Sequence, residues 1–189
     1  MKGRVYPLSF TTSAARALSV AGHPFILIPL TVAAASGSLF WGAVIAACTT
    51  IPLLLVIVRN VRSGKWSDVD VSRHDQRSGL YRAGLPLILA CGVVLYFLGA
   101  SPGMMRGLAA AAVIFAAGLI GNRWLKISMH MMFGGFCAVA ISRSYPYALL
   151  PSLAFLALLA WSRWHLKRHT WTEIAVGTVI GLVCGWAAG

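Results

Sequence analysis

The sequence predicts an all-α integral membrane protein, a polytopic transmembrane helix bundle of six or seven helices. Hydrophobic residues make up 59% of its 189 residues, and charged residues make up only 11%. A soluble domain contains about 25% charged residues, so this composition lies outside the soluble range. In a hydrocarbon core about 30 Å thick, apolar helices of about 20 residues satisfy their own backbone hydrogen bonds.

Seven apolar segments follow one another along the chain. Their approximate bounds are 17–35, 39–58, 83–100, 108–121, 131–142, 148–161 and 174–188. The fifth is shorter than a usual spanning helix, so the pattern allows either six or seven crossings. Tight links containing Gly or Pro leave no room for a soluble domain, so residues 1–189 are expected to form a single integral membrane domain. The first 20 residues have no pattern typical of a removable signal peptide.

Three polar segments interrupt the apolar pattern, at 59–82, 122–130 and 162–173. If all seven apolar segments cross the membrane, these polar segments share one face with the N-terminus. Every Lys and Arg except Arg106 and Arg143 then lies on that face. The positive-inside rule places it in the cytoplasm, and we expect a bacterial-type inner (plasma) membrane. The net charge of +12 predicts contact with anionic membrane lipids and not with nucleic acid.

The carboxylates and most histidines fall within the same three polar segments. They are Asp68, Asp70, Asp75, Glu173, His74, His130, His165 and His169. His169 and Glu173 are four residues apart, so on a helix they share a face and the carboxylate can accept from one imidazole nitrogen. That bond would fix the tautomer and leave the other nitrogen free to attack an electrophile. The alternative is a simple ion pair at the start of a helix.

The second polar segment offers groups suited to an anion and to proton transfer. Ser128 stands where a helix cap is expected, so its hydroxyl and nearby backbone N–H groups could bind anionic oxygen. Lys126 adds a positive charge, and His130 could protonate a leaving alkoxide.

The third polar segment, together with parts of the other two, resembles the signatures of the type 2 phosphatidic acid phosphatase (PAP2) superfamily of membrane lipid phosphatases. Its third signature is Ser-Arg, five residues, His, three residues, Asp, and here SRWHLKRHTWTE at 162–173 has glutamate in the last place. The second, Pro-Ser-Gly-His, is matched in part by ISMH at 127–130. The first, Lys, six residues, Arg-Pro, is approximated by Lys65 with either Arg73 or Arg77.

The resemblance implies a phosphohydrolase that needs no metal or other cofactor and works through a phosphohistidine. By resemblance His169 is the nucleophile, Glu173 its orienting carboxylate and His130 the general acid. The implied phosphate-binding residues are Arg163, Lys65, Arg73, Arg77, Ser128 and Lys126. Guanidinium and ammonium groups can stabilise the charge of a phosphoryl group in transfer. The expected substrate is a lipid-linked phosphate monoester or diphosphate.

Two other functional classes remain open from the sequence. A transporter, flippase or assembly subunit would use the basic loops only to hold anionic head groups. A membrane prenyl- or phosphotransferase would use Asp68, Asp70 and Asp75 to hold magnesium bound to a diphosphate. His23 lies inside the first apolar segment, where an ionisable residue is either functional or bonded to a neighbouring helix.

Overall fold

A computed structural model describes residues 10–189 of the chain. The described part is all-helical, as predicted, and Lys2 and Arg4 of the expected basic face lie outside it. The helices are α1 (Phe10–Ala21), α2 (Pro24–Ser36), α3 (Leu39–Ile45), a π-helical turn (Ala46–Thr50), α4 (Ile51–Arg62), α5 (His74–Phe97), α6 (Pro102–Gly121), α7 (Met129–Ser144), a 3₁₀ turn (Pro146–Ala148), α8 (Leu149–His165) and α9 (Trp171–Ala187).

Four helical stretches of the described chain are long and apolar enough to cross a membrane, at 39–62, 74–97, 102–121 and 146–165. The bent pair α1 and α2 makes a fifth if it counts as one span, and α9 is a shorter apolar helix. The polar segment predicted at 59–82 is helical at both ends, because α4 continues to Arg62 and α5 begins at His74.

The first apolar segment is broken, where the sequence pattern predicted one continuous helix. α1 and α2 meet at an angle of 53°, and the sequence at the break is Gly22-His23-Pro24. Proline has no backbone N–H and clashes with the preceding turn, so it starts a new helix here. His23 is the N-cap of α2, and its Nδ1 accepts a hydrogen bond from the backbone N–H of Phe25.

α7 lies in the interior of the bundle, and α9 packs directly against its backbone. Every residue from Met129 to Ala138 is buried. Three glycines of α9, spaced four apart, face α7. A β-carbon at any of them would press on a backbone carbonyl of α7 or of its N-cap residue: Gly177, Gly181 and Gly185. Small residues at this spacing let two helices approach closely within a membrane. The contact brings the first turns of α7 and α9 together, where the Ser128 N–H donates to the Glu173 carbonyl oxygen.

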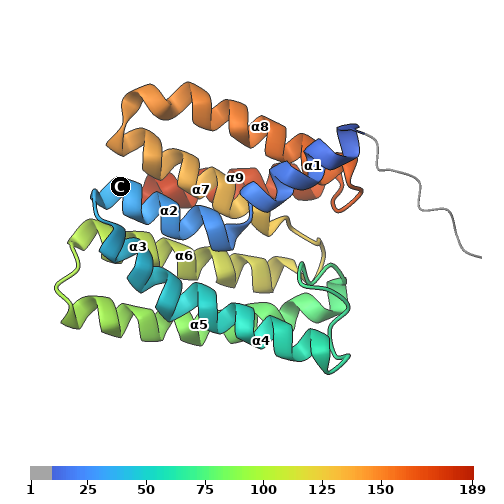
Figure 1. Ribbon diagram of the computed structural model, residues 1–189, viewed down its shortest axis with the longest axis horizontal. Coiled ribbons are helices and arrows are strands. Elements are labelled where there is room, and N and C mark those ends of the chain that lie inside the picture. The colour runs from blue at the N-terminus through green and yellow to red at the C-terminus, as the bar shows by residue number, and fades with distance from the viewer. Residues whose placement is uncertain (1–9) are drawn as a thin grey trace, which may run out of the picture.

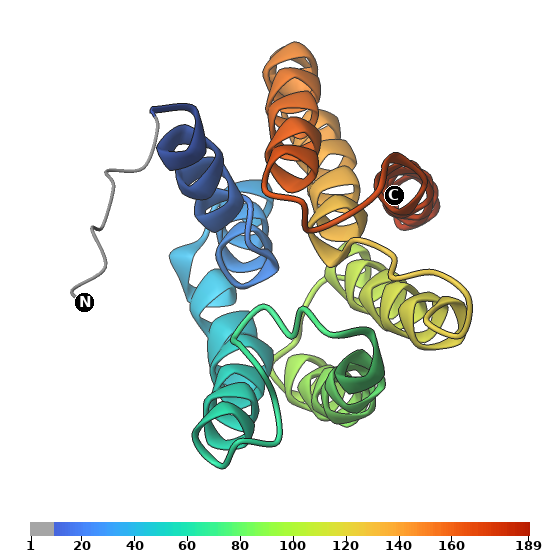
Figure 2. The same cartoon turned by 90° about the vertical axis from the view of Figure 1, so that its right-hand side faces the viewer.

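The three polar loops lie together at one end of the bundle (Figures 1 and 2). They are the α4–α5, α6–α7 and α8–α9 connections. His74 at the start of α5 hydrogen-bonds the Asn122 carbonyl, and the Asn122 amide donates back to the His74 carbonyl at 3.1 Å. This reciprocal pair joins the first two polar loops.

Candidate functional site

The end of α8 carries a buried arginine that is held by α1. Ser162 Oγ donates to the Ala15 carbonyl oxygen at 2.6 Å, and Arg163 Nη1 donates to Ser19 Oγ. Ser162 and Arg163 are 0% and 3% exposed. An arginine is rarely buried to this extent without a charged partner, and the anionic group beside Arg163 is Asp70, whose Oδ2 lies 3.6 Å from Nη1.

His169 is held at the mouth of α9 in one tautomer. Its Nδ1 lies 3.0 Å from the Lys126 carbonyl oxygen and 3.2 Å from Glu173 Oε2. Both partners are acceptors, so Nδ1 carries the proton and Nε2 keeps its lone pair. Burial, then the charges of Arg77, Arg163 and Lys126, lower the pKa of His169 to about 2, which keeps the imidazole neutral at physiological pH.

Glu173 has a second bond that fixes its carboxylate. Oε2 accepts from the Thr170 backbone N–H at 3.0 Å, while Thr170 Oγ1 accepts from the Glu173 N–H. This capping box anchors the first turn of α9. The carboxylate that faces His169 is therefore positioned by the helix start itself.

His130 lies in the first turn of α7 and is buried. Its Nε2 is 3.2 Å from the Ser19 carbonyl oxygen of α1. Because a carbonyl only accepts, Nε2 carries a proton and Nδ1 is the nitrogen at which proton exchange can occur. The neighbouring Ser128 is the N-cap residue of α7, but its side chain makes no capping bond.

A small polar cavity lies between these groups, with a volume of about 40 Å³. At about 10–15 Å³ for each water, it holds about three water molecules, a space on the scale of one small anion. His130 and His169 both line it, so the structure brings the two predicted catalytic histidines to one cavity. Four cationic side chains from different elements line it as well: Arg77, Lys126, Arg163 and Arg168.

The cations of the cavity are only partly satisfied by the protein. Arg77 Nη1 donates to the Ile127 carbonyl oxygen at 2.7 Å, and Arg163 Nη1 lies 3.6 Å from Asp70 Oδ2. Within residues 10–189, the Nε of Arg77 and the Nε of Arg163 are buried and have no hydrogen-bond partner. A buried unpaired donor costs about 1–3 kcal/mol, more if charged, so each of these arginines has hydrogen-bonding capacity that the described chain does not use.

Burial also lowers the pKa of Lys126. The neighbouring charges of Arg77, Arg163 and Arg168 lower it further, against an opposing effect of Glu173. An anion in the cavity would raise the pKa of Lys126 again, because it would favour the charged ammonium.

Three predicted phosphate-binding residues do not line the cavity. Lys65 is exposed in the α4–α5 loop. Arg73 pairs with Asp75 at 3.1 Å, and both side chains are 63% exposed. Ser128 Oγ is fully buried, and in the described chain it has no hydrogen-bond partner.

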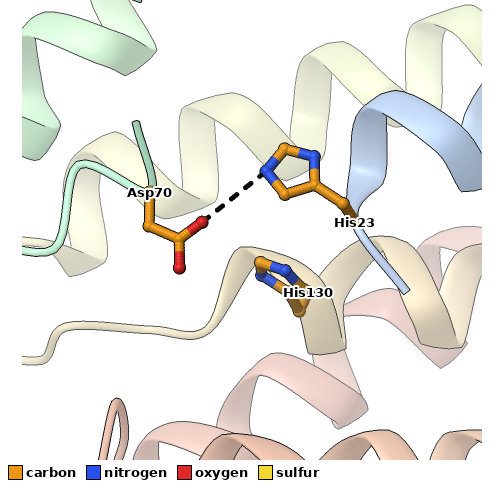
Figure 3. Close-up of side chains that lie close together, drawn as sticks. All are labelled: His23, Asp70 and His130. Carbon is orange, nitrogen blue, oxygen red and sulfur yellow. Dashed lines mark ion pairs between the residues drawn. The ribbon is translucent and has the colours of Figure 1, made fainter. Parts of the chain in front are cut away.

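Sequence reasoning did not assign His23, Asp70 or Arg168 to the site, and all three line the cavity. His23 Nε2 lies 3.9 Å from Asp70 Oδ1, and the His23 and His130 rings are 5.0 Å apart, edge to face. Figure 3 shows these side chains converging from the start of α2, the α4–α5 loop and α7. The signal for His23 was present, because it is an ionisable residue within an apolar segment and directly precedes a proline.

By distance alone, one group of the described residues could hold a metal ion. The ligand atoms of His23, Asp70 and His130 lie within 4.8 Å of one another. Their hydrogen bonds do not fit a cation. His23 Nδ1 accepts from Phe25 N–H, so Nε2 carries the proton and has no lone pair for a metal. Asp70 is paired with Arg163, and four cations line the same cavity.

The three aspartates of the α4–α5 loop each have a different set of partners. Asp68 accepts from Ser67 and Ser72 Oγ; burial raises its pKa, but these hydrogen bonds outweigh that effect and lower it overall. Asp75 pairs with Arg73, and Asp70 faces Arg163 and His23. They do not converge on one point as ligands of a magnesium diphosphate would.

A second, apolar cavity of about 350 Å³ adjoins the polar one. Pro24, Phe25 and Met129 line both cavities, and Ser144 lines the apolar cavity at the opposite end of α7. At 1.5 Å per residue, Met129 and Ser144 are about 22 Å apart along the helix. The apolar cavity therefore extends from the site through most of the bundle.

No protein-family model matches this sequence, and comparisons with curated proteins and with solved structures give no match either.

Proposed function

We propose that this protein is a membrane phosphatase that hydrolyses a lipid-linked phosphate monoester or diphosphate through a phosphohistidine, as its resemblance to the PAP2 superfamily implies. One observation carries the proposal. His169, a neutral imidazole oriented by Glu173, lines a cavity that Arg77 and Arg163 also line, and each of these two arginines keeps a buried, unpaired Nε–H. A nucleophile beside cationic donors for anionic oxygen is what phosphoryl transfer requires.

In the proposed reaction the lone pair on His169 Nε2 attacks phosphorus, and the bond from phosphorus to the leaving-group oxygen breaks. His130, whose Nε2–H stays bonded to the Ser19 carbonyl, takes a second proton on Nδ1 when the negatively charged phosphate binds. It gives this proton to the leaving oxygen and regains one from the attacking water. Arg77, Arg163, Arg168 and Lys126 offset the charge on the phosphoryl oxygens. Water then attacks the phosphohistidine, releases inorganic phosphate and restores the His169 lone pair.

The apolar cavity supports a lipid as the substrate. A cavity of about 350 Å³ falls in the range of small-molecule sites. Its apolar length of about 22 Å suits a long hydrocarbon chain whose phosphate lies in the polar cavity. The tail then stays in an apolar medium throughout the reaction.

We also propose that the chain crosses an inner (plasma) membrane of bacterial type six or seven times, with the polar loops on the cytoplasmic face. α7 is shorter than a usual spanning helix, but protein surrounds its first ten residues. This burial supports counting α7 as one of the crossings. The concentration of Lys and Arg at the end with the polar loops supports the orientation.

The test is release of inorganic phosphate from a panel of lipid monophosphates and diphosphates by purified protein in excess EDTA. We expect release by the wild type and a loss of at least about 10³-fold in His169→Asn, which removes the nucleophile. His165→Asn is the matched control, because His165 stacks on Trp161 and does not line the cavity. No release from any lipid, or equal release by His169→Asn, would contradict the proposal.

A further inference from the structure

His23 lies at the polar cavity, although no signature of the resemblance includes it. It belongs to the break between α1 and α2, and its orientation follows from the N-cap. Pro24 follows His23 and has no N–H, so the first amide that α2 offers is that of Phe25. That amide donates to His23 Nδ1 at 3.2 Å.

The cap fixes the protonation of the ring. With Nδ1 accepting a backbone N–H, the neutral imidazole must carry its proton on Nε2. This Nε2–H is on the side of the ring nearest Asp70 (Figure 3). His23 is therefore a neutral hydrogen-bond donor with a fixed direction, and it cannot become an imidazolium without losing the cap.

Asp70 marks where an anionic oxygen can bind. Its two carboxylate oxygens lie 3.9 Å from His23 Nε2 and 3.6 Å from Arg163 Nη1. Both distances exceed hydrogen-bond length, so the carboxylate is attracted to two donors without satisfying either one. Val71, the next residue, is fully buried with φ of +45°, a strained conformation for a β-branched residue.

We propose that His23 is a phosphate-contacting residue, and that its Nε2–H and the Arg163 guanidinium form a two-donor subsite for an oxygen of the phosphoryl group. Asp70 stands in for that oxygen in the structure described here. The inference rests on the proposed function, because it takes the polar cavity to be a phosphate site. It adds a neutral donor from the first apolar segment to the cationic clamp.

The variant that tests this is His23→Asn. Asparagine is among the best N-cap residues, so its side-chain oxygen can accept from the Phe25 amide while the Nε2–H donor is lost. The measurements are the affinity for radiolabelled inorganic phosphate in detergent and the kcat and KM for the best lipid phosphate of the panel. The melting temperature confirms that the variant folds.

Repeating the His23→Asn measurement in a protein that also carries Asp70→Asn distinguishes contact between His23 and phosphate from a structural role of His23. Asp70→Asn removes the carboxylate that His23 faces, so a purely structural His23–Asp70 pair would make the His23→Asn effect disappear in this background. We expect instead that His23→Asn weakens phosphate binding about tenfold or more in both backgrounds, the scale for a hydrogen bond to a charged group. Asp70→Asn alone should strengthen phosphate binding, because it removes a competing anion.

The outcomes distinguish this inference from the proposed function. Unchanged phosphate affinity and unchanged kinetics in His23→Asn, with an active wild type, would overturn the role of His23 and leave the phosphatase standing. The role of His23 would also be overturned if His23→Asn weakened phosphate binding only in the protein that keeps Asp70. A wild type that binds phosphate through His23 but releases none from any lipid would leave the subsite standing and refute the phosphatase. A wild type that binds no phosphate and releases none would refute both.

Discussion

Arginines at the two ends of the bundle have different partners. At the end without the polar loops, Arg106 Nε donates to the Ala188 carbonyl oxygen at 3.1 Å, and Arg143 Nη2 donates to the Trp186 carbonyl oxygen at 2.9 Å. Both are exposed and bond carbonyls at the C-terminal end of α9. At the other end, Arg77 and Arg163 are 4% and 3% exposed, and each keeps an unpaired Nε.

This difference separates two uses of the same side chain. Cations near a helix C-terminus complement its dipole and its orphan carbonyls, so Arg106 and Arg143 have a structural explanation. Arg77 and Arg163 carry the cost of desolvation without full hydrogen bonding, which gives no net stability by itself. The proposed phosphate site would explain why these two positions hold arginine.

The largest effect that would test this comparison is expected from Arg163→Gln. Removing the guanidinium should lower kcat/KM for a lipid phosphate by about 10²–10³-fold, the scale for losing one donor that stabilises developing charge. Ser19→Ala is the matched variant, because it removes the hydrogen bond that Arg163 makes to α1 and keeps the charge. Similar losses in both variants would mean that Arg163 acts only through helix packing.

Glu173→Gln is expected to lower kcat by about 10–100-fold, the cost of a charge-assisted hydrogen bond. The loss should be smaller than that of removing the nucleophile, because the Lys126 carbonyl still accepts from His169 Nδ1 and fixes the tautomer. Glutamine can still accept from the Thr170 N–H, so α9 should start as before. Steady-state kinetics measure this effect, and an unchanged kcat would exclude an orienting role for Glu173.

The third prediction concerns stability against pH. The pKa of His169 falls from an ordinary 6.5 to about 2 on folding. Between these two pH values the unfolded chain binds a proton at His169 and the folded chain does not. The free energy of unfolding should therefore decrease as pH falls below about 6.5, by about 2 kcal/mol at pH 5 from this residue. Between pH 7.5 and 5 the wild type should lose more thermal stability than His169→Asn. Equal losses would show that His169 does not stay neutral.

The smallest effect on catalysis is expected from Arg143→Gln and Arg106→Gln. Each should lower the melting temperature by about 1–4 °C, since an exposed cation at a helix C-terminus contributes little. Both side chains border the far end of the apolar cavity and neither reaches the polar cavity, so phosphate release should fall far less than in Arg163→Gln. A large loss of activity with an unchanged melting temperature would remove the contrast between the two ends.

The features that follow from local chemistry could be predicted from the sequence. Apolar segments with tight links predicted an all-helical fold, and the four-residue spacing of His169 and Glu173 predicted their hydrogen bond, which the structure contains at 3.2 Å. The order of segments also predicted that the three polar loops would meet at one end (Figure 1). Each inference needed only composition, periodicity and alternation of direction.

The rest depends on contacts between distant helices. His23 reaches the site because α1 packs on α8 through Ser162 and Arg163, and no periodicity encodes that pairing. Asp70 was one of three nearby aspartates with similar surroundings in the sequence. Arg73 and Arg77 were equally fair candidates for the arginine of the first signature, and only the start of α5 at His74 turns Arg77 inward while Arg73 stays exposed.

The glycine contact between α9 and α7 has a consequence for how the chain tolerates substitution. At Gly181 the nearest atoms of α7 all belong to its backbone, so no flexible side chain there can move aside to accept a larger residue. A methyl group at Gly181 would overlap the Met132 carbonyl oxygen. To relieve this overlap α9 would have to move away from α7, and its N-terminal end would move with it. The N-terminal end of α9 adjoins His169, so the hydrogen bond between His169 Nδ1 and the Lys126 carbonyl oxygen would be disturbed. Gly181 lies about three turns from the proposed nucleophile, yet its substitution would lower activity as if the residue took part in the reaction.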